Sequence, residues 1–600
     1  GFSMASRLSS GLRQLWRAGR SSRVWLRTAS TSSSSGASVR RVVGAGVFGL
    51  GLAASGAAAQ WWHSHQAEAA ASGYPPKLPT EEEWKASIAA QHGNLIIATM
   101  HDGDEAQAQL PKVTKFYPFL IISHPRAVVT QSAISVITDV HPDAEILIVS
   151  DKYNFDDDNG NRIYSGSFAR TTSSSINPAR LNISPFSTSK SKLDEELLMP
   201  LSNMTHSKGV NMCSNAYAVK LDVRNKLVHL SDGRVFSFGK CLLATGCREA
   251  KLPGIPAELL PHVTNLRKVK DFDKVQTLVR EGRIKNIVVV GGGFLGCQVA
   301  AKLADQGKAK HVEVIHAYVE PGALYRYVPT YFSDYVTERL RALGVSERPY
   351  HMVLNIKEPA EKGHNLSLAL QGFEKATIQC GHVVFAPTHL EGNVELAQQA
   401  GLEIDTHCGG VMVNSELLAR SDIYVAGDTA SYPDTMLGRR RMQSFDHSYH
   451  SGAVAAFNMA TGGREAYNHL PVITSSGGPM AMEVVVLGDI DSNSEMYSVY
   501  QTDNNNPKAG ESEVPGWEQW EKGIVYYMKN RKVVGAMLLN LSGRTDDVRQ
   551  LIRHGLSYTH RNGEEIEELN GAIDLGLINP TYRHSASRGS GLSRFHTTHN

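Results

Sequence analysis

Cysteine is scarce in this chain, with six among 600 residues, and no CxxC pair occurs. This spacing argues against a disulfide scaffold, a zinc ribbon and a thioredoxin-type redox motif. Buried thiols are the expected state of all six. The serine clusters at 172–175 and 186–191 contain no GxSxG sequence, so hydrolase chemistry is not supported.

Acidic residues are missing from the start of the chain, where the first one is Glu68. The same region is rich in arginine, with eight in residues 1–41: Arg7, Arg13, Arg17, Arg20, Arg23, Arg27, Arg40 and Arg41. Subtracting these eight from the 61 basic residues leaves 53 against 59 acidic ones, a net charge of about −6. An acidic body argues against nucleic acid as a partner, because phosphate contacts require clustered positive charge.

The arginine-rich, serine-rich start of the chain predicts a targeting signal. Residues 1–41 have the composition of a mitochondrial presequence, with a disordered basic arm as the alternative. The Gly-Phe-Ser before Met4 is not counted as part of this presequence. Val42–Ala59 then runs 18 residues without a charge, and about 20 apolar residues span a bilayer. We therefore predict a transmembrane anchor at 42–62, or else a second cleaved sorting signal.

Basic residues before the anchor predict which side of the membrane the body faces. Arg40 and Arg41 favour the matrix side, which would place the body in the intermembrane space of the mitochondrial inner membrane. Residues 63–115 mix Ala-rich, Pro-rich and acidic stretches and are expected to form a linker.

A glycine-rich turn in the middle of the chain is the clearest chemical motif. The apolar strand Ile287–Val290 leads into GGGFLG (291–296), a helical pattern and a second strand at 311–320. In this order Gly291 makes the tight turn, Gly293 lets the backbone approach a pyrophosphate, and Gly296 lets helix and strand pack closely. The sequence therefore predicts a dinucleotide-binding site, with Glu320 as the acid that binds the ribose.

A second unit of this kind is predicted near residue 117, but its turn is altered. The strand YPFLIIS leads into Ser123-His-Pro-Arg126, followed by a helical stretch and a strand that ends in Asp151. Proline removes an amide donor, and side chains obstruct close approach of the backbone. We expect the fold to survive here and the phosphate cradle to be lost, unless Arg126 supplies charge in place of the amides.

Two later strands end in short polar turns. GKCLLATG (239–246) ends in Thr245-Gly246, and SDIYVAGDTA (421–430) contains Gly427-Asp428. In flavoproteins with two dinucleotide domains, such segments return the chain to the FAD domain. The predicted fold class is α/β, with two doubly wound Rossmann-like domains of the glutathione-reductase type and an α+β C-terminal domain.

With these motifs, the chain resembles the mitochondrial apoptosis-inducing factor family, a branch of the FAD/NAD(P)-dependent pyridine nucleotide reductases. The matching segments are GGGFLG (291–296), NVELAQQAGLEID (393–405), GGVMVNSELLARSDIYVAGD (409–428), LGRRR (437–441) and KGIVYYMKNRKVVGAMLLN (522–540). The resemblance implies weak NADH oxidation, support of respiratory-complex biogenesis with an import partner, and release during cell death in animals. The positions it maps to the nucleotides or their scaffold are Gly291, Gly293, Gly296, Glu320, Arg326, Asp151, Thr245, Gly246, Gly427 and Asp428.

Departures from the family pattern gather where the flavin and nicotinamide rings would meet. Ser123–Arg126 replaces the FAD glycine turn, and the family's Arg-Pro-Pro-Leu-Ser-Lys segment has no counterpart after Asp151. Where the family has a glutamate, this sequence has Gln298, and where the family has a flavin-facing histidine, it has Phe445. Residues 387–392 occupy the place of the family's Gly-Leu-Glu-Pro stretch. Hydride transfer needs the two rings stacked at near contact, so these losses should compound.

The resemblance implies a sequence of domains along the chain. Residues 116–265 and 391–465 would form the FAD-type domain, 266–390 the NAD-binding domain and 466–585 a C-terminal interface domain. A disordered tail is expected at 586–600. His447 and His450 lie three apart and His407 adjoins Cys408, but the sequence places no third ligand at metal spacing, so no metal site is expected.

Two functions remain open at this point. The first is a membrane-tethered, catalytically degenerate structural or assembly component of the respiratory chain that has lost efficient redox chemistry, with NAD(H) as its possible cofactor at 291–296 and FAD as a doubtful one. The second is an active FAD-dependent NADH oxidoreductase with a divergent FAD loop. Partners of the first would be proteins of a respiratory or import complex, with a homodimer as a further expectation. No catalytic residue is assigned.

Overall fold

A computed structural model describes residues 82–83, 113–152, 209–249, 255–267, 269–360, 363–372, 375–386, 390–477, 482–502, 520–555, 582–586 and 594–596. The chain divides into two units, Gly1–Glu68 and Ala69–Asn600, and all described residues belong to the second. The presequence and anchor predictions therefore lie outside the described residues. Within them, no helix is both long enough and apolar enough to cross a membrane.

The first sheet has seven strands built from two distant parts of the chain. Its strands are β1 (Lys115–Ser123), β2 (Ile146–Asp151), β3 (Val210–Asp222), β4 (Leu227–Leu230), β5 (Val235–Ala244), β17 (Leu418–Arg420) and β18 (Ile423–Val425). β1 pairs in parallel with both β2 and β5, and β5 pairs in parallel with β18. β1 and β2 contain long buried apolar runs, as is typical of parallel strands whose two faces are both covered.

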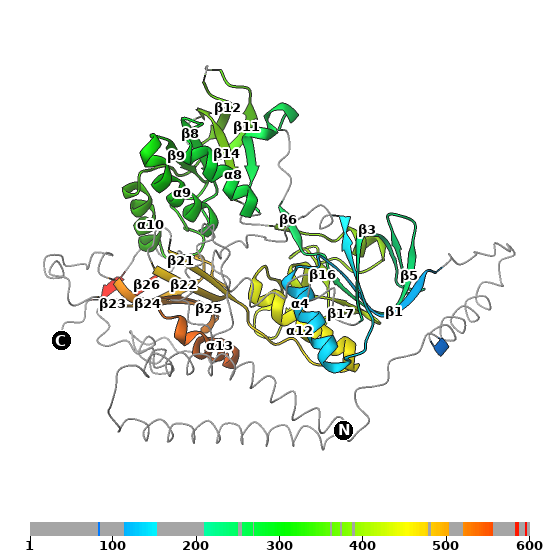
Figure 1. Ribbon diagram of the computed structural model, residues 1–600. Helices are drawn as coiled ribbons and strands as arrows, with labels where there is room; N and C mark the ends of the chain where they lie inside the picture. Colours follow the sequence, from blue (N-terminus) through cyan, green and yellow to red (C-terminus); the bar gives the residue numbers. More distant parts are fainter. Residues whose placement is uncertain are drawn as a thin grey trace, which may run out of the picture. The chain divides into compact units, whose positions relative to one another are not determined.

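Two helices separated by about 300 residues pack together beside this sheet. They are α4 (Val128–Val140) and α12 (Phe445–Thr461), and they lie side by side (Figure 1). α4 buries Ala133, Ile134 and Ile137 in the core that the sheet also fills. Ser444 caps the start of α12, and its side chain accepts a hydrogen bond from the His447 amide; Gly462 caps the end of the helix. This packing joins the two halves of the predicted FAD-type domain.

The second sheet is entirely parallel and lies between those two halves in the sequence. Its strand order is β10-β9-β8-β14-β7. The strands are β7 (Val263–Asn265), β8 (Asn286–Val290), β9 (Glu313–Ala317), β10 (Val345–Arg348) and β14 (His382–Phe385). The helical elements are η2 (Ala257–His262), α8 (Val269–Arg280), α9 (Phe294–Gly307), η3 (Lys308–Lys310) and α10 (Thr330–Ala342). The strand expected at 311–320 is shorter, because His311 adopts a left-handed conformation before β9 and the chain turns after Ala317.

Short strands complete the two dinucleotide-type folds. β11 (Met352–Lys357), β12 (Leu366–Gln371) and β13 (Lys375–Cys380) form an antiparallel sheet. β6 (Cys247–Glu249) pairs with β15 (Leu390–Gly392) where the chain leaves and re-enters the first domain. The remaining elements are α11 (Glu395–Gln399), β16 (Val411–Met412), η4 (Gly427–Thr429), β19 (Ala430–Asp434) and β20 (Gly438–Arg441). This architecture confirms the predicted fold class.

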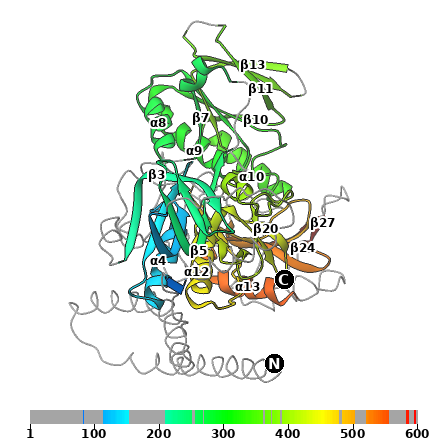
Figure 2. The same cartoon turned by 90° about the vertical axis from the view of Figure 1, so that its right-hand side faces the viewer.

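The C-terminal region forms a seven-stranded antiparallel sheet in the order β21-β22-β25-β24-β23-β26-β27. The elements are β21 (Val472–Gly477), β22 (Met482–Gly488), β23 (Glu495–Thr502), β24 (Trp520–Lys529), β25 (Lys532–Leu539), η7 (Ser542–Arg544), α13 (Thr545–His554), β26 (Tyr582–Ala586) and β27 (Arg594–His596). α13 packs against β22 and β25, and Figure 2 shows this helix beside the sheet that contains β24. The C-terminal sheet also shares a hydrophobic core with the helices of the second sheet. There the Tyr331 hydroxyl of α10 lies 2.6 Å from the Tyr500 hydroxyl of β23, which connects α10 to this sheet.

Part of the predicted tail at 586–600 is described as a strand. Arg594–His596 forms β27 and pairs with β26 across the register Arg583↔His596. The low-complexity composition concealed a three-residue strand that is specified by an existing sheet edge rather than by its own pattern.

None of the six cysteines forms a disulfide, and five of them are buried as expected; Cys408 is half-buried. Burial raises the pKa of the Cys380 thiol to about 12 and raises those of Cys241 and Cys297 as well. Because the thiolate is the reactive form, these thiols are inert at neutral pH.

Candidate functional site

The carboxyl edge of the first sheet gathers most of the predicted site residues. The register aligns Ser123 of β1 with Ala244 of β5, and Leu243 of β5 with Val425 of β18. The turns that follow β5 and β18, Thr245-Gly246 and Gly427-Asp428, therefore lie next to each other. Asp151 ends the neighbouring strand β2 and is 4% exposed. Ligands of doubly wound sheets bind at this edge.

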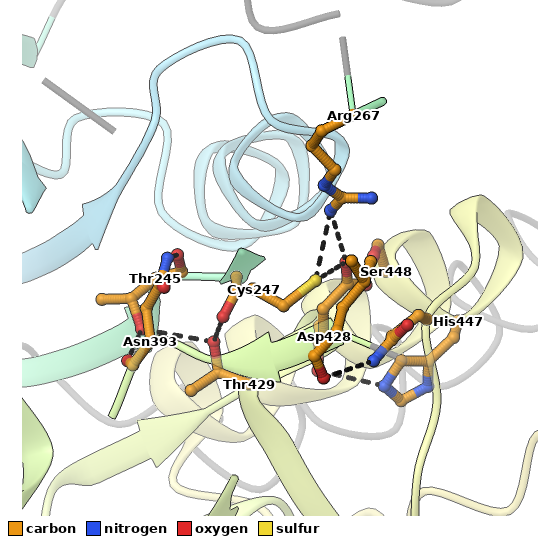
Figure 3. A network of polar contacts seen from close by, with 12 residues as sticks. Thr245, Cys247, Arg267, Asn393, Asp428, Thr429, His447 and Ser448 are labelled. Carbon is orange, nitrogen blue, oxygen red and sulfur yellow. Dashed lines mark hydrogen bonds and ion pairs between the residues drawn. The ribbon is translucent and has the colours of Figure 1, made fainter. Parts of the chain in front are cut away.

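Asp428 lies at the centre of a buried polar cluster at that edge (Figure 3). Ser448 Oγ donates to its Oδ1 over 3.1 Å, and Cys247 Sγ donates to its Oδ2 over 3.2 Å. Arg267 Nη2 lies 3.7 Å from Oδ2 and donates to Cys247 Sγ over 3.1 Å. The side chains of Arg267 and Asp428 are only 3% and 4% exposed. This is a buried ion pair between Arg267, which follows β7 of the inserted domain, and Asp428, which follows β18 of the first domain.

A second set of contacts fixes the turn after β5. Thr245 Oγ1 donates to the Asn393 carbonyl over 2.7 Å, and Asn393 Nδ2 donates to the Thr245 carbonyl over 2.9 Å. Thr429 Oγ1 donates to the Gly246 carbonyl over 2.7 Å. These reciprocal bonds connect β5 to the segment between β15 and α11 and to η4, so the turn is held by the region where the chain re-enters the domain.

The turn after β18 is held by α12. Ser451 Oγ accepts from the Gly427 amide over 2.9 Å, and His447 Nε2 lies 3.2 Å from the Gly427 carbonyl. A carbonyl only accepts, so Nε2 carries the proton, and Nδ1 accepts from the Tyr467 hydroxyl at 2.7 Å. Burial lowers the pKa of His447 to about 3, so this imidazole is neutral.

The turn between β1 and α4 is bonded to itself. The Arg126 amide donates to His124 Nδ1 over 3.1 Å, and the Ala127 amide donates to the His124 carbonyl over 2.9 Å. Pro125 has no amide hydrogen. Thr130 Oγ1 also donates to the His124 carbonyl, over 2.9 Å. A phosphate-binding loop offers free backbone amides at these positions. Here Pro125 has none, and the amides of Arg126 and Ala127 are already hydrogen-bonded to His124.

The turn between β8 and α9 has a different character. Gly291 has φ +126°, and a Cβ there would lie 2.6 Å from the Ala386 carbonyl oxygen. α9 begins directly after Gly293, which leaves the first amides of a fourteen-residue helix at the turn. His316 Nε2 lies 2.9 Å from the Gly291 carbonyl, and its Nδ1 lies 3.2 Å from Glu347 Oε1. The side chains of His316 and Glu347 are both buried and support the turn from below.

Glu320 lies beside the glycine turn as the sequence predicts. Its Oε2 is 3.3 Å from where a Cβ of Gly292 would lie, and its Oε1 is 2.5 Å from Arg326 Nε. The Glu320 side chain is 16% exposed, whereas that of Arg326 is 66% exposed. The structure thus places Gly291, Gly293, Gly296, Glu320 and Arg326 in one neighbourhood. This is the arrangement that holds a pyrophosphate and its ribose in the dinucleotide fold.

Gly296 gives a test of this second turn. A Cβ at this position would lie 1.8 Å from the Gly291 carbonyl oxygen, so Gly296→Ala forces the helix away from the turn. We expect a loss of NAD(H) affinity of at least about tenfold and a stability loss of about 1–3 kcal/mol from overpacking, measured by fluorescence titration and by thermal melting.

The matched control for this substitution is Gly543→Ala. A Cβ at Gly543 meets nothing within 4 Å, so both quantities should stay near their original values. Equal NAD(H) affinity in Gly296→Ala and Gly543→Ala would contradict the assignment of this turn.

Several residues of the site have no sequence signature. Arg267, Cys247, Asn393 and Ser448 were not singled out, because their roles come from contacts across 20 to 181 positions of chain. For Arg267, the available signal was an arginine two positions after the end of β7. The expectation of no metal site stays a prediction, but Asp446 and His469, which were not singled out, bring donor atoms within 4.8 Å of those of His450 and of one another.

Besides the turn at Ser123–Arg126, two single positions that depart from the family pattern are described. Gln298 on α9 donates to Ser475 Oγ of the C-terminal sheet, and Phe445 is buried at the start of α12. Residues 153–208, after Asp151, and 387–389 lie outside the described residues. The expectations for those segments stay predictions.

The comparisons with known proteins agree with this geometry. Residues 157–452 match the pyridine nucleotide-disulphide oxidoreductase family, and residues 491–554 match the mitochondrion-associated C-terminal region of apoptosis-inducing factor. A ferredoxin reductase of Rhodopseudomonas palustris superposes with a TM-score of 0.55 at 22% identity, over 74% of this chain and 95% of that one. Putidaredoxin reductase, in its covalent complex with putidaredoxin, gives 0.56 at 16% identity, over 77% and 99%. The fold and its two nucleotide edges thus define a pyridine nucleotide-disulphide oxidoreductase.

Relatives at higher identity narrow the family. Mitochondrial apoptosis-inducing factor 1 of Dictyostelium discoideum is 33% identical over 367 residues, which is 60% of this chain and 64% of that protein. A Drosophila melanogaster relative with the same family name is 30% identical over 390 residues, which is 59% and 52%. The chain therefore spans less than two thirds of the length of either relative. It belongs to the apoptosis-inducing factor family of pyridine nucleotide oxidoreductases, a class that binds FAD and NAD(P)H.

Proposed function

We propose that this chain is an NAD(H)-binding member of its family in which FAD binding is weakened and hydride transfer is inefficient. It would act as a structural or assembly component of the respiratory chain. The observation that carries the proposal is the β1–α4 turn, where the amides of Arg126 and Ala127 are bonded to His124.

A dinucleotide pyrophosphate binds to amides at the start of the helix after the first strand. In this turn Pro125 offers none, and the next two amides would have to exchange an internal hydrogen bond for one to phosphate. Arg126 is exposed and carries positive charge there, but a single exposed side chain does not reproduce a cradle of fixed amides. These features do not fit a tightly held FAD.

The Asp428 cluster points the same way. In a flavoprotein, this aspartate would accept hydrogen bonds from the flavin's ribityl and pyrophosphate portion. Here Oδ1 already accepts from Ser448 and Oδ2 from Cys247, with Arg267 beside it. Binding a flavin would require part of this buried network to open.

The second turn fits NAD(H). When bound, NADH would supply a hydride and NAD⁺ would accept one. This chain would hold its pyrophosphate at the amides after Gly291 and its ribose hydroxyls at Glu320, with Arg326 orienting the carboxylate through the 2.5 Å contact. His316 and Glu347 keep the turn in place beneath the site.

The proposed location rests on the relatives and on the N-terminal sequence. Both apoptosis-inducing factor relatives are named as mitochondrial, and residues 1–41 have the composition of a presequence. We place the chain at the mitochondrial inner membrane through Val42–Ala59, with its body facing the intermembrane space. Its partners would be proteins of a respiratory or import complex, and a homodimer is the proposed assembly.

A second function, an active FAD-dependent NADH oxidoreductase, is favoured by a specific observation. The turns Thr245-Gly246 and Gly427-Asp428 meet at the carboxyl edge where this class holds its flavin. Under this alternative, Arg267 and Ser448 would turn from Asp428 toward the bound cofactor.

The visible absorbance spectrum of the purified full chain separates the two functions. We expect no stoichiometric flavin band, and no band that bleaches when NADH is added under nitrogen. A bound flavin that NADH reduces would overturn the proposal and establish the alternative.

NAD(H) binding is measured on the same protein by fluorescence titration. Glu320→Gln should weaken it by about tenfold, because hydrogen bonds to a charged acceptor are worth about 1.5–3 kcal/mol. Glu313→Gln, at the opposite end of β9 and exposed, is the matched control and should bind like the original chain. If neither the original chain nor the control binds NAD(H), the proposed function fails.

A further inference from the structure

Three metal-ligating side chains from two separate segments meet beside the start of α12. Asp446 lies in the first turn of α12, His450 lies one turn later, and His469 lies on the segment leading into β21. Asp446 Oδ1 is 3.4 Å from His450 Nε2, and Asp446 Oδ2 is 2.6 Å from His469 Nε2. All three donor groups lie within 4.8 Å of one another.

The positions of these groups are fixed by their surroundings. Asp446 is 4% exposed, and its Oδ2 also accepts from the Val472 amide over 3.0 Å. The rings of His450 and His469 are stacked with centroids 3.8 Å apart, so both Nε2 atoms face the same carboxylate. The i, i+4 spacing on one helix face is how helices present a pair of metal ligands.

We propose that Asp446, His450 and His469 bind one divalent transition-metal ion of the Zn²⁺ class. Metal–ligand bonds of about 2.0–2.1 Å at tetrahedral angles place neighbouring ligand atoms about 3.4 Å apart, as Asp446 and His450 already are. Two imidazoles and one carboxylate are the ligand set of three-ligand zinc centres. Oxygen-preferring ions such as Mg²⁺ and Ca²⁺ suit this set poorly.

The access path suits such an ion. His450 and His469 are 32% and 19% exposed, which leaves a side open for entry and for a water as the fourth ligand.

The ion would connect two parts of the chain. Asp446 and His450 belong to the helix that closes the FAD-type domain, whereas His469 begins the approach to the C-terminal sheet. Arg549 of α13, which donates to the Leu470 carbonyl over 3.0 Å, is the cation facing this cluster and would moderate the affinity. Metal binding would stabilise this junction through mass action.

Metal binding is tested on the metal-stripped full chain by calorimetric titration with ZnCl₂ and by elemental analysis after dialysis. We expect one ion per chain. His450→Gln should reduce the affinity by more than about tenfold, because even outer-shell partners of a metal cost that much. His450 is the variant of choice, since it is partly exposed and its loss leaves the Asp446–His469 contact in place.

The chain has 24 histidines, so weak surface binding needs a matched control. His554→Gln removes an exposed histidine of α13 and should bind like the original chain. A second variant, Asp446→Asn, retains an oxygen that accepts from the Val472 amide and should also lose the ion. If the original chain takes up no stoichiometric ion, or if His450→Gln and His554→Gln bind alike, the three residues are a hydrogen-bonded cluster and the proposal is overturned.

Discussion

Replacing Arg267 with methionine is expected to lower the free energy of unfolding by about 3–5 kcal/mol. The guanidinium lies 3.7 Å from Asp428 with both side chains at most 4% exposed. Removing it leaves a buried carboxylate without its cation, and water cannot reach that carboxylate to compensate. Urea unfolding of the original and variant chains, read by tryptophan fluorescence, measures the difference.

Two controls separate this effect from the loss of an arginine in general. Arg267→Met combined with Asp428→Asn removes both charges, so it should recover a large part of the stability lost in the single variant. Lys115→Met breaks an ion pair in which both side chains are 45% exposed and should cost at most about 1 kcal/mol. A double variant no more stable than Arg267→Met would show that the buried charge is not the cause.

The intact glycine turn could be predicted from sequence because its parts are local. Gly291, Gly293 and Gly296 lie within six positions between a continuous apolar strand and an apolar helix, and backbone geometry alone requires them. Glu320 could be predicted for the same reason, since it follows the next strand at a nearly fixed distance. The altered turn at Ser123–Arg126 was visible as well, because a missing glycine and an added proline have direct backbone consequences.

The partners of Asp428 could not be predicted in this way. Arg267 and Cys247 precede it by more than 150 positions, and Ser448 follows it by 20. Their meeting depends on an inserted domain whose two connections return to the same sheet edge. Periodicity and propensity describe single elements, so contacts that arise from the order of domains are outside their reach.

The histidines illustrate the same limit. The spacing of His447 and His450 was seen, but the two side chains have different surroundings: His447 is buried against Gly427 and Tyr467, whereas His450 faces Asp446 and His469. Helical spacing places residues on neighbouring faces, and only the packed chain after α12 decides what each face meets.

Acid is expected to destabilise this chain well before its carboxylates are protonated, because two buried histidines must stay neutral. His382 is 1% exposed with Nε2 2.8 Å from Thr264 Oγ1, and His447 is fully buried. Burial lowers the pKa of each to about 3, from an ordinary value of 6.5. Between pH 6.5 and 3 the unfolded chain therefore binds more protons than the folded one, and stability falls as the pH falls.

The size of this effect follows from the pH interval. One pKa unit corresponds to about 1.4 kcal/mol, so lowering the pH from about 7 to about 5 should cost about 2 kcal/mol for each of the two histidines. Urea unfolding at the two pH values gives the loss. His382→Gln removes one titrating group and still offers Thr264 a hydrogen-bond partner, so its loss over this interval should be about 2 kcal/mol smaller. The exposed His554→Gln should keep the original pH dependence. If His382→Gln and His554→Gln lose stability equally between the two pH values, the buried neutral imidazole of His382 is not a source of the acid sensitivity.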